Sequence, residues 1–181
     1  MRVTPAALAD VLIIEPDVFT DARGTFFESY NAARFDAAIP GKPRFVQDNH
    51  SVSARHVLRG LHYQVTNAQA KLVRVIAGEI FDVSVDLRRS SPTFGRWNGI
   101  VLSSVNRKQV WVPEGFAHGF LVLSDSADVL YKTTDYYTPA AERTLQWNDP
   151  DLAIDWPVTA PVILSAKDAA GIPLSLADVF P

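Results

Sequence analysis

Short stretches in which apolar and polar residues alternate, separated by glycine or proline, follow one another along most of the chain. Lys71–Ile76 and Ile80–Leu87 are two of them, with Gly78 in the turn between, and they predict an antiparallel pair with one buried face. The second stretch sets an apolar side with Val83 against a polar side with Asp82. The same pattern predicts further strands at Val11–Ile14, Thr25–Tyr30, Val57–Gln64, Trp97–Leu102, Gln109–Val112, Val129–Tyr137 and Glu142–Trp147. Roughly ten short strands predict an all-β jelly-roll barrel or sandwich with a few short peripheral helices.

Helical signals are weaker and fall outside these strands. Asn31–Ile39 predicts one helix, because Asn31 is a good N-cap and a Pro-Gly pair follows the last residue. The tail beyond Asn148 is predicted to be irregular, with short helical hints. The run Phe45–Ser53 is rich in amides, which suit recognition of a base or sugar edge. Taken alone, however, it favours a loop whose Asx side chains cap their own backbone.

Length and composition are those of an ordinary folded protein. The 181 residues predict one domain over 1–181, and 48% hydrophobic and 20% charged residues exclude disorder for most of the chain. A net charge of −3 argues against binding to a nucleic acid polymer. With no cysteine, the candidate catalysts are histidine, carboxylate, tyrosine and lysine. The N-terminal apolar run is short and follows Asp10, so we expect no secretory signal, no membrane span and a cytoplasmic location.

The stretch Val57–Lys71 gathers two cations and a histidine. Arg59 and His62 have opposite parity, so on a regular strand they would face opposite sides of the sheet. If both serve one cavity, Gly60 must mark a bulge or kink that re-aims one of them. The competing interpretation is a strand with His62 hydrogen-bonded in a core and Arg59 in solvent.

Two further polar side chains share strand faces with apolar residues. Lys71 alternates with Val73, which makes it a candidate for an inward-pointing cation, although a snorkelling lysine at a strand end would give the same pattern. His118 has the parity of Phe120. On that inward face it is either a hydrogen-bonded core histidine or a residue of a site.

Two strand-borne histidines raise the question of a metal, since many β-barrel sites hold one with histidines and a carboxylate. Such a site would have a second histidine two residues after His62, where this chain has Gln64. Lys71 stands near the position of the expected glutamate, and an ammonium beside a divalent cation is electrostatically unfavourable. The sequence therefore predicts acid–base chemistry with no metal.

Several longer stretches are highly specific when taken together. They are FTDARGTFFESY, QDNHSVS, VLRGLHYQ, AKLVRVIAGEIFDVSVDLRRSSPTFGRW, VWVPEGFAHGF, YKTTDYY and WNDPDLAIDWP. From about Val11 to the C-terminus the chain resembles the dTDP-4-dehydrorhamnose 3,5-epimerases of the cupin superfamily, with no departure at the family's catalytic positions. The resemblance implies a cupin jelly roll, a homodimer that exchanges N-terminal strands, no cofactor, and an isomerase of activated L-rhamnose synthesis.

The chemistry that the resemblance implies is epimerisation beside a ketone. The substrate is dTDP-4-dehydro-6-deoxy-D-glucose, whose C4 ketone makes the protons on C3 and C5 acidic, and the product is dTDP-4-dehydro-L-rhamnose. By resemblance His62 is the base, Tyr131 the acid, Lys71 the cation at the enolate oxygen, and Asp168 the carboxylate that holds the His62 tautomer. A neutral imidazole, with a reference pKa of about 6.5, suits a base, and a phenol, at about 10, stays protonated.

The resemblance also implies a set of substrate-binding positions, some of which are expected to reach a neighbouring subunit's site. They are Arg23, Glu28, Gln47, Asp48, Asn49, Arg59, Lys71, His118, Tyr137, Glu142 and Lys167, with Tyr137 stacking on thymine. Three alternatives stay open: a related enzyme that epimerises only one carbon or moves the ketone, a noncatalytic sugar-binding cupin, and a metal-dependent oxygenase or isomerase. Binding alone needs no matched acid and base, which argues against the second.

Overall fold

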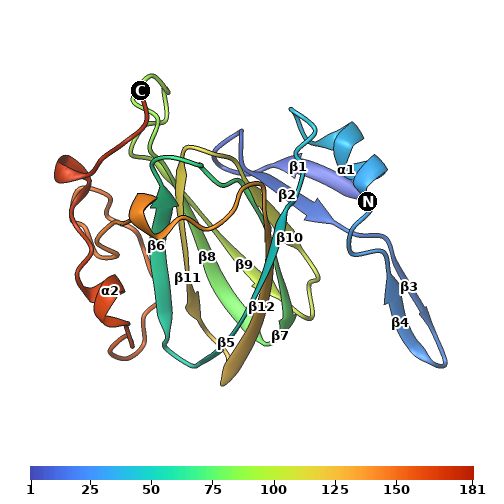
Figure 1. The fold of residues 1–181 in the computed structure, drawn as a ribbon. Helices are drawn as coiled ribbons and strands as arrows, with labels where there is room; N and C mark the ends of the chain where they lie inside the picture. Colours follow the sequence, from blue (N-terminus) through green and yellow to red (C-terminus); the bar gives the residue numbers. More distant parts are fainter.

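Two antiparallel β-sheets face each other in the computed structural model, which describes residues 1–181 (Figure 1). The six-stranded sheet has the order β1-β2-β10-β7-β12-β5, and the five-stranded sheet has the order β13-β6-β11-β8-β9. Neighbours in each sheet are mostly distant in sequence, as expected of a jelly roll of the cupin type. The predicted fold class is therefore confirmed.

The elements are short. The strands are β1 Arg2–Pro5, β2 Leu12–Glu15, β3 Val18–Asp21, β4 Gly24–Phe27, β5 Gln47–Ala54, β6 Leu58–Gln64, β7 Lys71–Ala77, β8 Glu79–Asp86, β9 Trp97–Ser103, β10 Gln109–Val112, β11 Phe116–Val122, β12 Ser126–Thr133 and β13 Glu142–Thr144. The helices are α1 Ala32–Ala38 and α2 Ala166–Ala169, with 3₁₀ turns η1 Pro139–Ala141 and η2 Leu174–Leu176. None of the helices has the length and apolar character needed to cross a membrane.

Most predicted elements are confirmed, but one run is wrongly assigned and several predicted strands extend too far. Helix α1 begins after Asn31, whose side chain caps it as predicted. The run Phe45–Ser53 is not a loop, because its residues from Gln47 onward form β5 and pair with β12 over the full length of both strands. Strand β12 ends at Thr133 rather than at Tyr137, and residues 134–138 are irregular.

The five-stranded sheet is buried on both faces, which corrects the expectation of one buried face. The C-terminal segment packs over its outer side (Figure 1). Leu152 and Trp156 of this segment join Val83 in one apolar cluster. Asp82 and Asp86, on the other side of β8, are 1% and 0% exposed. Because a buried carboxylate needs hydrogen-bond partners, the polar side of β8 is committed to specific contacts.

An apolar cluster fills one end of the space between the sheets and gives way to polar residues at the other. Val75 and Val129 belong to this cluster, on β7 and β12. Lys71 lies on the same face of β7 as Val75, and Tyr131 lies on the same face of β12 as Val129. The Lys71 side chain is buried, so the predicted inward-pointing cation is confirmed.

The N-terminal segment forms a sheet edge and a projection. Strand β2 pairs with β1 and with β10 of the same chain. The hairpin of β3 and β4 stands away from the body of the molecule and belongs to neither large sheet (Figure 1). Its cross-strand partners Phe19 and Phe26 are 64% and 71% exposed. A lone hairpin with exposed aromatic rings has little stability of its own.

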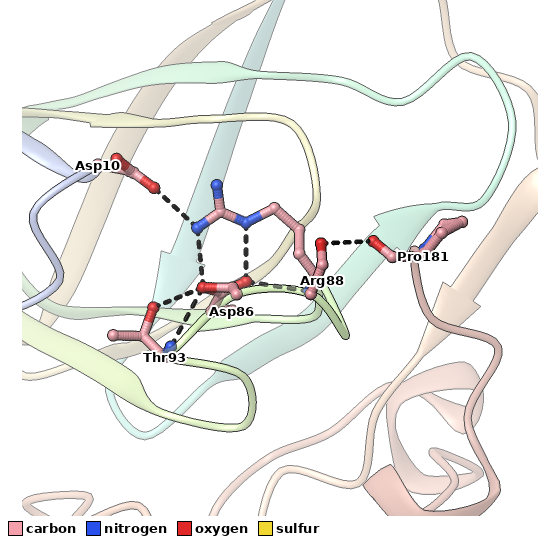
Figure 2. A network of polar contacts seen from close by, with 7 residues as sticks. Asp10, Asp86, Arg88, Thr93 and Pro181 are labelled. Carbon is pink, nitrogen blue, oxygen red and sulfur yellow. Dashed lines mark hydrogen bonds and ion pairs between the residues drawn. The ribbon is translucent and has the colours of Figure 1, made fainter.

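Asp86 ties the end of β8 to the following loop and to the N-terminal segment (Figure 2). Its carboxylate accepts hydrogen bonds from Nε and Nη2 of Arg88 at 2.9 and 2.8 Å, and from the hydroxyls of Ser91 and Thr93 at 2.6 and 2.7 Å. Nη2 of Arg88 also donates to Asp10 at 2.8 Å. Burial raises the pKa of Asp86, but these bonds outweigh it and hold the pKa well below its usual range.

We expect Asp86→Asn to lower the free energy of unfolding by about 3 kcal/mol, because Arg88 loses its buried counter-charge. Asp10→Asn is the matched control: Asp10 binds the same guanidinium nitrogen from a 58% exposed side chain, and its loss should cost under about 1 kcal/mol. Since the folded-state pKa of Asp86 is lowered, its contribution is complete above an unfolded pKa of about 3.9 and is lost as the pH falls toward the folded value. Urea unfolding measures both variants, and equal losses would contradict this assignment.

Candidate active site

A cavity of about 340 Å³ opens between the polar ends of the two sheets. The residues that line it are Gln47, Asn49, Ser51, Arg59, His62, Tyr63, Gln64, Gln69, Lys71, His118, Gly119, Phe120, Tyr131, Tyr137, Glu142 and Lys167. Strands β5, β7 and β12 form one wall, and β6 and β11 form the other. Amide, cationic and hydroxyl groups dominate the lining, so the cavity suits a polar ligand.

A bulge in β6 turns Arg59 and His62 into the same cavity. In the pairing of β6 with β11, two residues of β6, Gly60 and Leu61, lie opposite the single residue Gly119. Gly60 has a φ of +114°, and a Cβ there would lie 2.7 Å from the Cα of Gly119. Only glycine accepts that combination of dihedral angle and contact. The predicted bulge at Gly60 is confirmed.

Asp168, in α2, orients the imidazole of His62. Nε2 of His62 and Oδ1 of Asp168 are 2.5 Å apart, and the Ser165 hydroxyl donates to the other carboxylate oxygen at 2.8 Å. Burial raises the pKa of Asp168, but the bonds from His62 and Ser165 outweigh it and leave the pKa below 3.8. Burial also lowers the pKa of His62 below 6.5, and Asp168 offsets only part of this effect. At neutral pH the imidazole is therefore neutral, with Nε2–H donated to the carboxylate and a lone pair on Nδ1.

Lys71 reaches from one sheet to the other. It comes from β7, and its Nζ donates to the backbone oxygen of His62 on β6 at 3.3 Å. Burial lowers the pKa of Lys71 to about 8, although the charges of Asp82 and Glu142 raise it in part. The ammonium is thus largely protonated at neutral pH, and no carboxylate bonds to it directly.

Tyr131 stands on the wall opposite His62. It belongs to β12 of the six-stranded sheet, whereas His62 belongs to β6 of the five-stranded sheet. Burial raises the pKa of Tyr131 above 10, and the charge of Arg59 lowers it in part. The phenol keeps its proton at neutral pH. A neutral imidazole and a protonated phenol therefore face the cavity from opposite sides.

His118 has a carboxylate partner of its own. Its Nε2 lies 2.8 Å from Oδ2 of Asp82, and the two residues are 6% and 1% exposed. His118 is paired with His62 across β6 and β11, so the two histidines are neighbours on one wall. His118 was predicted from the sequence as a site candidate, but Asp82 was not, because alternation along β8 assigned Asp82 to the side expected to be exposed.

Three residues form what we call the mouth of the cavity: Tyr137, Glu142 and Lys167. The Tyr137 hydroxyl donates to Oε2 of Glu142 at 2.9 Å, and Nζ of Lys167 donates to Oε1 at 2.8 Å. Burial raises the pKa of Glu142, but these two bonds outweigh it and the pKa lies below 4.5. Lys167 directly precedes Asp168 in α2, so one short helix serves both the mouth and His62.

The model of a protein family described as dTDP-4-dehydrorhamnose 3,5-epimerase matches residues 5–175. The chain belongs to this family. It is 58% identical over 181 residues to the dTDP-4-dehydrorhamnose 3,5-epimerase of Pseudomonas aeruginosa, with 100% of both chains covered. The Salmonella typhimurium enzyme of the same name is 57% identical over 171 residues, which cover 94% of this chain and 93% of that one.

A solved structure has the same fold. It is that of a dTDP-6-deoxy-D-glucose-3,5-epimerase from Legionella pneumophila in complex with dTDP-4-keto-L-rhamnose. The TM-score is 0.95 at 52% sequence identity, and the match covers 98% of this chain and 94% of that chain.

Most of the epimerase-family positions named from the sequence come together in the cavity. Gln47, Asn49, Arg59, His62, Lys71, His118, Tyr131, Tyr137, Glu142 and Lys167 line it. Asp168 stands behind His62. Three predicted residues lie elsewhere: the Asp48 side chain points away from the cavity and binds Lys132 at 2.9 Å, and Arg23 and Glu28 belong to the projecting hairpin and the residue after it.

Six lining residues were not assigned to a site from the sequence: Ser51, Tyr63, Gln64, Gln69, Gly119 and Phe120. Ser51 follows once β5 is known to be a strand, because it shares the side of Gln47 and Asn49. Its hydroxyl is buried with no hydrogen-bond partner, and a ligand could provide one. Gln69 lies in the loop before β7, where no spacing signal marks it.

The donor set of this cavity does not suit a metal ion. No three His, Cys, Asp or Glu side chains lie close enough together to hold one. Gln64, at the position where a second histidine ligand was considered, donates instead to the backbone oxygens of Asn67 and Tyr136. The residues present fit hydrogen bonding and proton transfer.

We expect Asp168→Asn to lower the pKa of His62 further. The substitution removes the carboxylate that raises this pKa and leaves both burial and the repulsion from Lys167 and Lys71, which lower it. An NMR titration of the His62 ring measures the shift. Asp36→Asn, on the exposed face of α1, is the control and should leave the His62 titration in place. A higher pKa in Asp168→Asn would disprove the assigned role of this carboxylate.

Proposed function

We propose that the protein converts dTDP-4-dehydro-6-deoxy-D-glucose to dTDP-4-dehydro-L-rhamnose, as a cofactor-independent isomerase of dTDP-L-rhamnose synthesis. The hydrogens on C3 and C5 are acidic because loss of either leaves an enolate whose charge lies on the C4 oxygen. Each inversion then needs a base on one face of the sugar, a positive group at the oxygen, and an acid on the other face. We place the reaction in the cytoplasm.

The observation that carries this proposal is the position of His62 and Tyr131 on opposite sheets. A sugar held between the sheets presents one ring face to each. Neutral His62 removes a proton through Nδ1, and Tyr131 delivers its phenolic proton to the same carbon from the other face, which inverts the centre. His62 is then protonated and Tyr131 ionised, so both exchange protons with solvent before the next step.

Lys71 stabilises the intermediate in this mechanism. The enolate oxygen carries a full negative charge, and a buried ammonium that has no bonded carboxylate can interact with it strongly. Asp168 acts on the other partner, because its charge stabilises the imidazolium that forms when His62 takes the proton. The pair of Lys71 with the enolate and the pair of Asp168 with the imidazolium therefore form together as the proton moves.

The rest of the cavity matches the nucleotide and the diphosphate. Arg59 and His118 bind around the sugar and the phosphates. Arg59 is exposed, and Lys167 is a second exposed cation that lines the cavity. Tyr137, which is 50% exposed at the mouth, stacks on thymine. The amides Gln47 and Asn49, together with Glu142, complete the substrate-binding set. A role for Asp48 stays a prediction.

We also infer a homodimer in which the exchanged N-terminal strands are β3 and β4. The projecting hairpin exposes Phe19 and Phe26 side by side, and burying such a pair against a second copy would stabilise both. Arg23 lies at the hairpin turn and Glu28 directly after β4. Exchange would carry these two predicted binding residues into the neighbouring subunit's cavity.

We expect His62→Ala to abolish both epimerisation and uptake of deuterium from heavy water, because no enolate forms. Tyr131→Phe keeps the base and Lys71, so it should still exchange hydrogen at C3 and C5 while losing inverted product, since deuterium returns mainly from the original face. Each loss of product formation should be about 10²–10⁴-fold. Mass spectrometry of deuterium content and NMR of the C3 and C5 configurations read both outcomes.

Tyr30→Phe is the control, because the Tyr30 ring packs against Phe35 and Phe45 outside the cavity. It should leave both rates unchanged. Wild-type exchange in His62→Ala, or wild-type inversion of both centres in Tyr131→Phe, would show that the roles are wrong. Inversion of a single carbon by the wild-type protein would instead identify a mono-epimerase.

Mixing two impaired variants, assayed at low substrate concentration, tests the shared site. Arg23→Ala should weaken substrate binding about tenfold or more in a homodimer, and His62→Ala should be inactive. A mixed dimer has one cavity that combines intact His62 with an intact Arg23 from the other subunit. Random exchange of equal amounts should therefore restore about a quarter of the wild-type sites.

Sedimentation velocity measures the oligomeric state of the wild-type protein and of a hairpin variant. Phe19→Ser with Phe26→Ser should shift the protein toward monomer, because the aromatic contact is lost. No recovery of activity on mixing, with subunit exchange verified by mass spectrometry, would rule out a site shared between subunits.

A further inference from the structure

The segment of residues 135–138 carries Tyr137 to the mouth of the cavity, yet it belongs to no strand or helix. Its backbone is held by glutamine side chains. Gln69 donates to the oxygen of Asp135 at 2.7 Å, Gln64 donates to that of Tyr136 at 3.2 Å, the Tyr137 amide donates to Gln47 at 3.1 Å, and the Thr138 amide donates to Gln64 at 2.7 Å. Hydrogen bonds to these side-chain amides replace the backbone hydrogen bonds that a neighbouring strand would provide.

Gln64 is the central member of this set. It is 3% exposed, and both ends of its amide are occupied, because Nε2 donates to Asn67 as well as to Tyr136 while Oε1 accepts from Thr138. An amide is suited to this position, since it donates and accepts at once. With its polar atoms bonded to the protein, Gln64 has little left to offer a ligand.

The Tyr137 side chain does little to hold itself in place. It is half exposed, and its one side-chain hydrogen bond runs from the hydroxyl to Glu142 at 2.9 Å. The direction of the ring is therefore set by the backbone on either side of it. Gln64 bonds to both flanking residues, Tyr136 and Thr138.

We propose that Gln64 is a positioning residue that pre-organises Tyr137 for the nucleotide and takes no part in proton transfer. The inference rests on the proposed function, in which Tyr137 stacks on the base. Without Gln64 the segment would have to be ordered when the ligand binds, which lowers affinity. Once the sugar is bound, His62, Lys71 and Tyr131 act as before.

Two substitutions separate the parts of this contact. Gln64→Leu removes every hydrogen bond, whereas Gln64→Glu keeps the acceptor for Thr138 and loses the donor to Tyr136 and Asn67. Both should raise KM and the Kd for dTDP, measured by calorimetry, by about tenfold or more, with kcat within about threefold. Gln146→Ala is the control, because Gln146 bonds to Asn148 in the C-terminal segment, and it should change none of these values.

A double-mutant cycle with Tyr137→Ala shows whether Gln64 acts through Tyr137. If it does, Gln64→Leu should weaken dTDP binding by less than about twofold in the Tyr137→Ala background, because the benefit is already lost. An equal loss in both backgrounds, a kcat that falls as far as kcat/KM, or an unchanged Kd would overturn the proposal. Gln64→Glu serves in the same cycle if circular dichroism shows that Gln64→Leu is unfolded.

The two proposals fail in different ways. If the wild-type protein inverts neither C3 nor C5, the proposed function is wrong. If it inverts them and the Gln64 variants bind dTDP as tightly as wild type, the proposed function stands and the role of Gln64 is wrong.

Discussion

The cavity depends on the close approach of β6 and β11 at Gly60 and Gly119. A Cβ on Gly119 would lie 2.5 Å from the backbone oxygen of Arg59, so neither strand can carry a side chain at this contact. The bulge that the contact permits lets Arg59 and His62 share one cavity. On a regular strand one of them would point toward the C-terminal segment, where a polar group would be buried among apolar side chains.

The ionisable groups of the cavity are compensated unequally, and Lys71, unlike the two histidines, is without a carboxylate partner. His62 and His118 each bond to a buried carboxylate, which fixes the ring and satisfies one nitrogen. Lys71 has only a backbone oxygen, and its pKa falls to about 8 because that partner does not balance the loss of solvent. Its charge is therefore available to an anionic group of a ligand.

The sequence predicts what periodicity controls, and it fails where tertiary context decides. Alternation located β7 and β8, and the opposite parity of Arg59 and His62 required a bulge at Gly60 if both were to serve one cavity. The amide-rich β5 was taken for a loop because composition does not reveal that a strand lines a polar cavity. Alternation separates the faces of β8 but does not say that both are covered, which hid Asp82. Asp168 bonds to His62 across 106 residues, and such a contact from an irregular tail was accessible only through family resemblance.

Two irregular segments deliver functional groups to this site, and each is fixed by a different force. Helix α2 has four residues, too few to be stable alone, and the segment that carries it is anchored by Leu152 and Trp156 on the outer face of the five-stranded sheet. The segment that carries Tyr137 lies at a polar mouth, where an apolar anchor would be exposed or would compete with the ligand. Hydrogen bonds from buried amides such as Gln64 are the remaining way to order it. The α2 segment is therefore held by apolar packing on the outer face of the five-stranded sheet, and the Tyr137 segment is held by hydrogen bonds at the polar mouth.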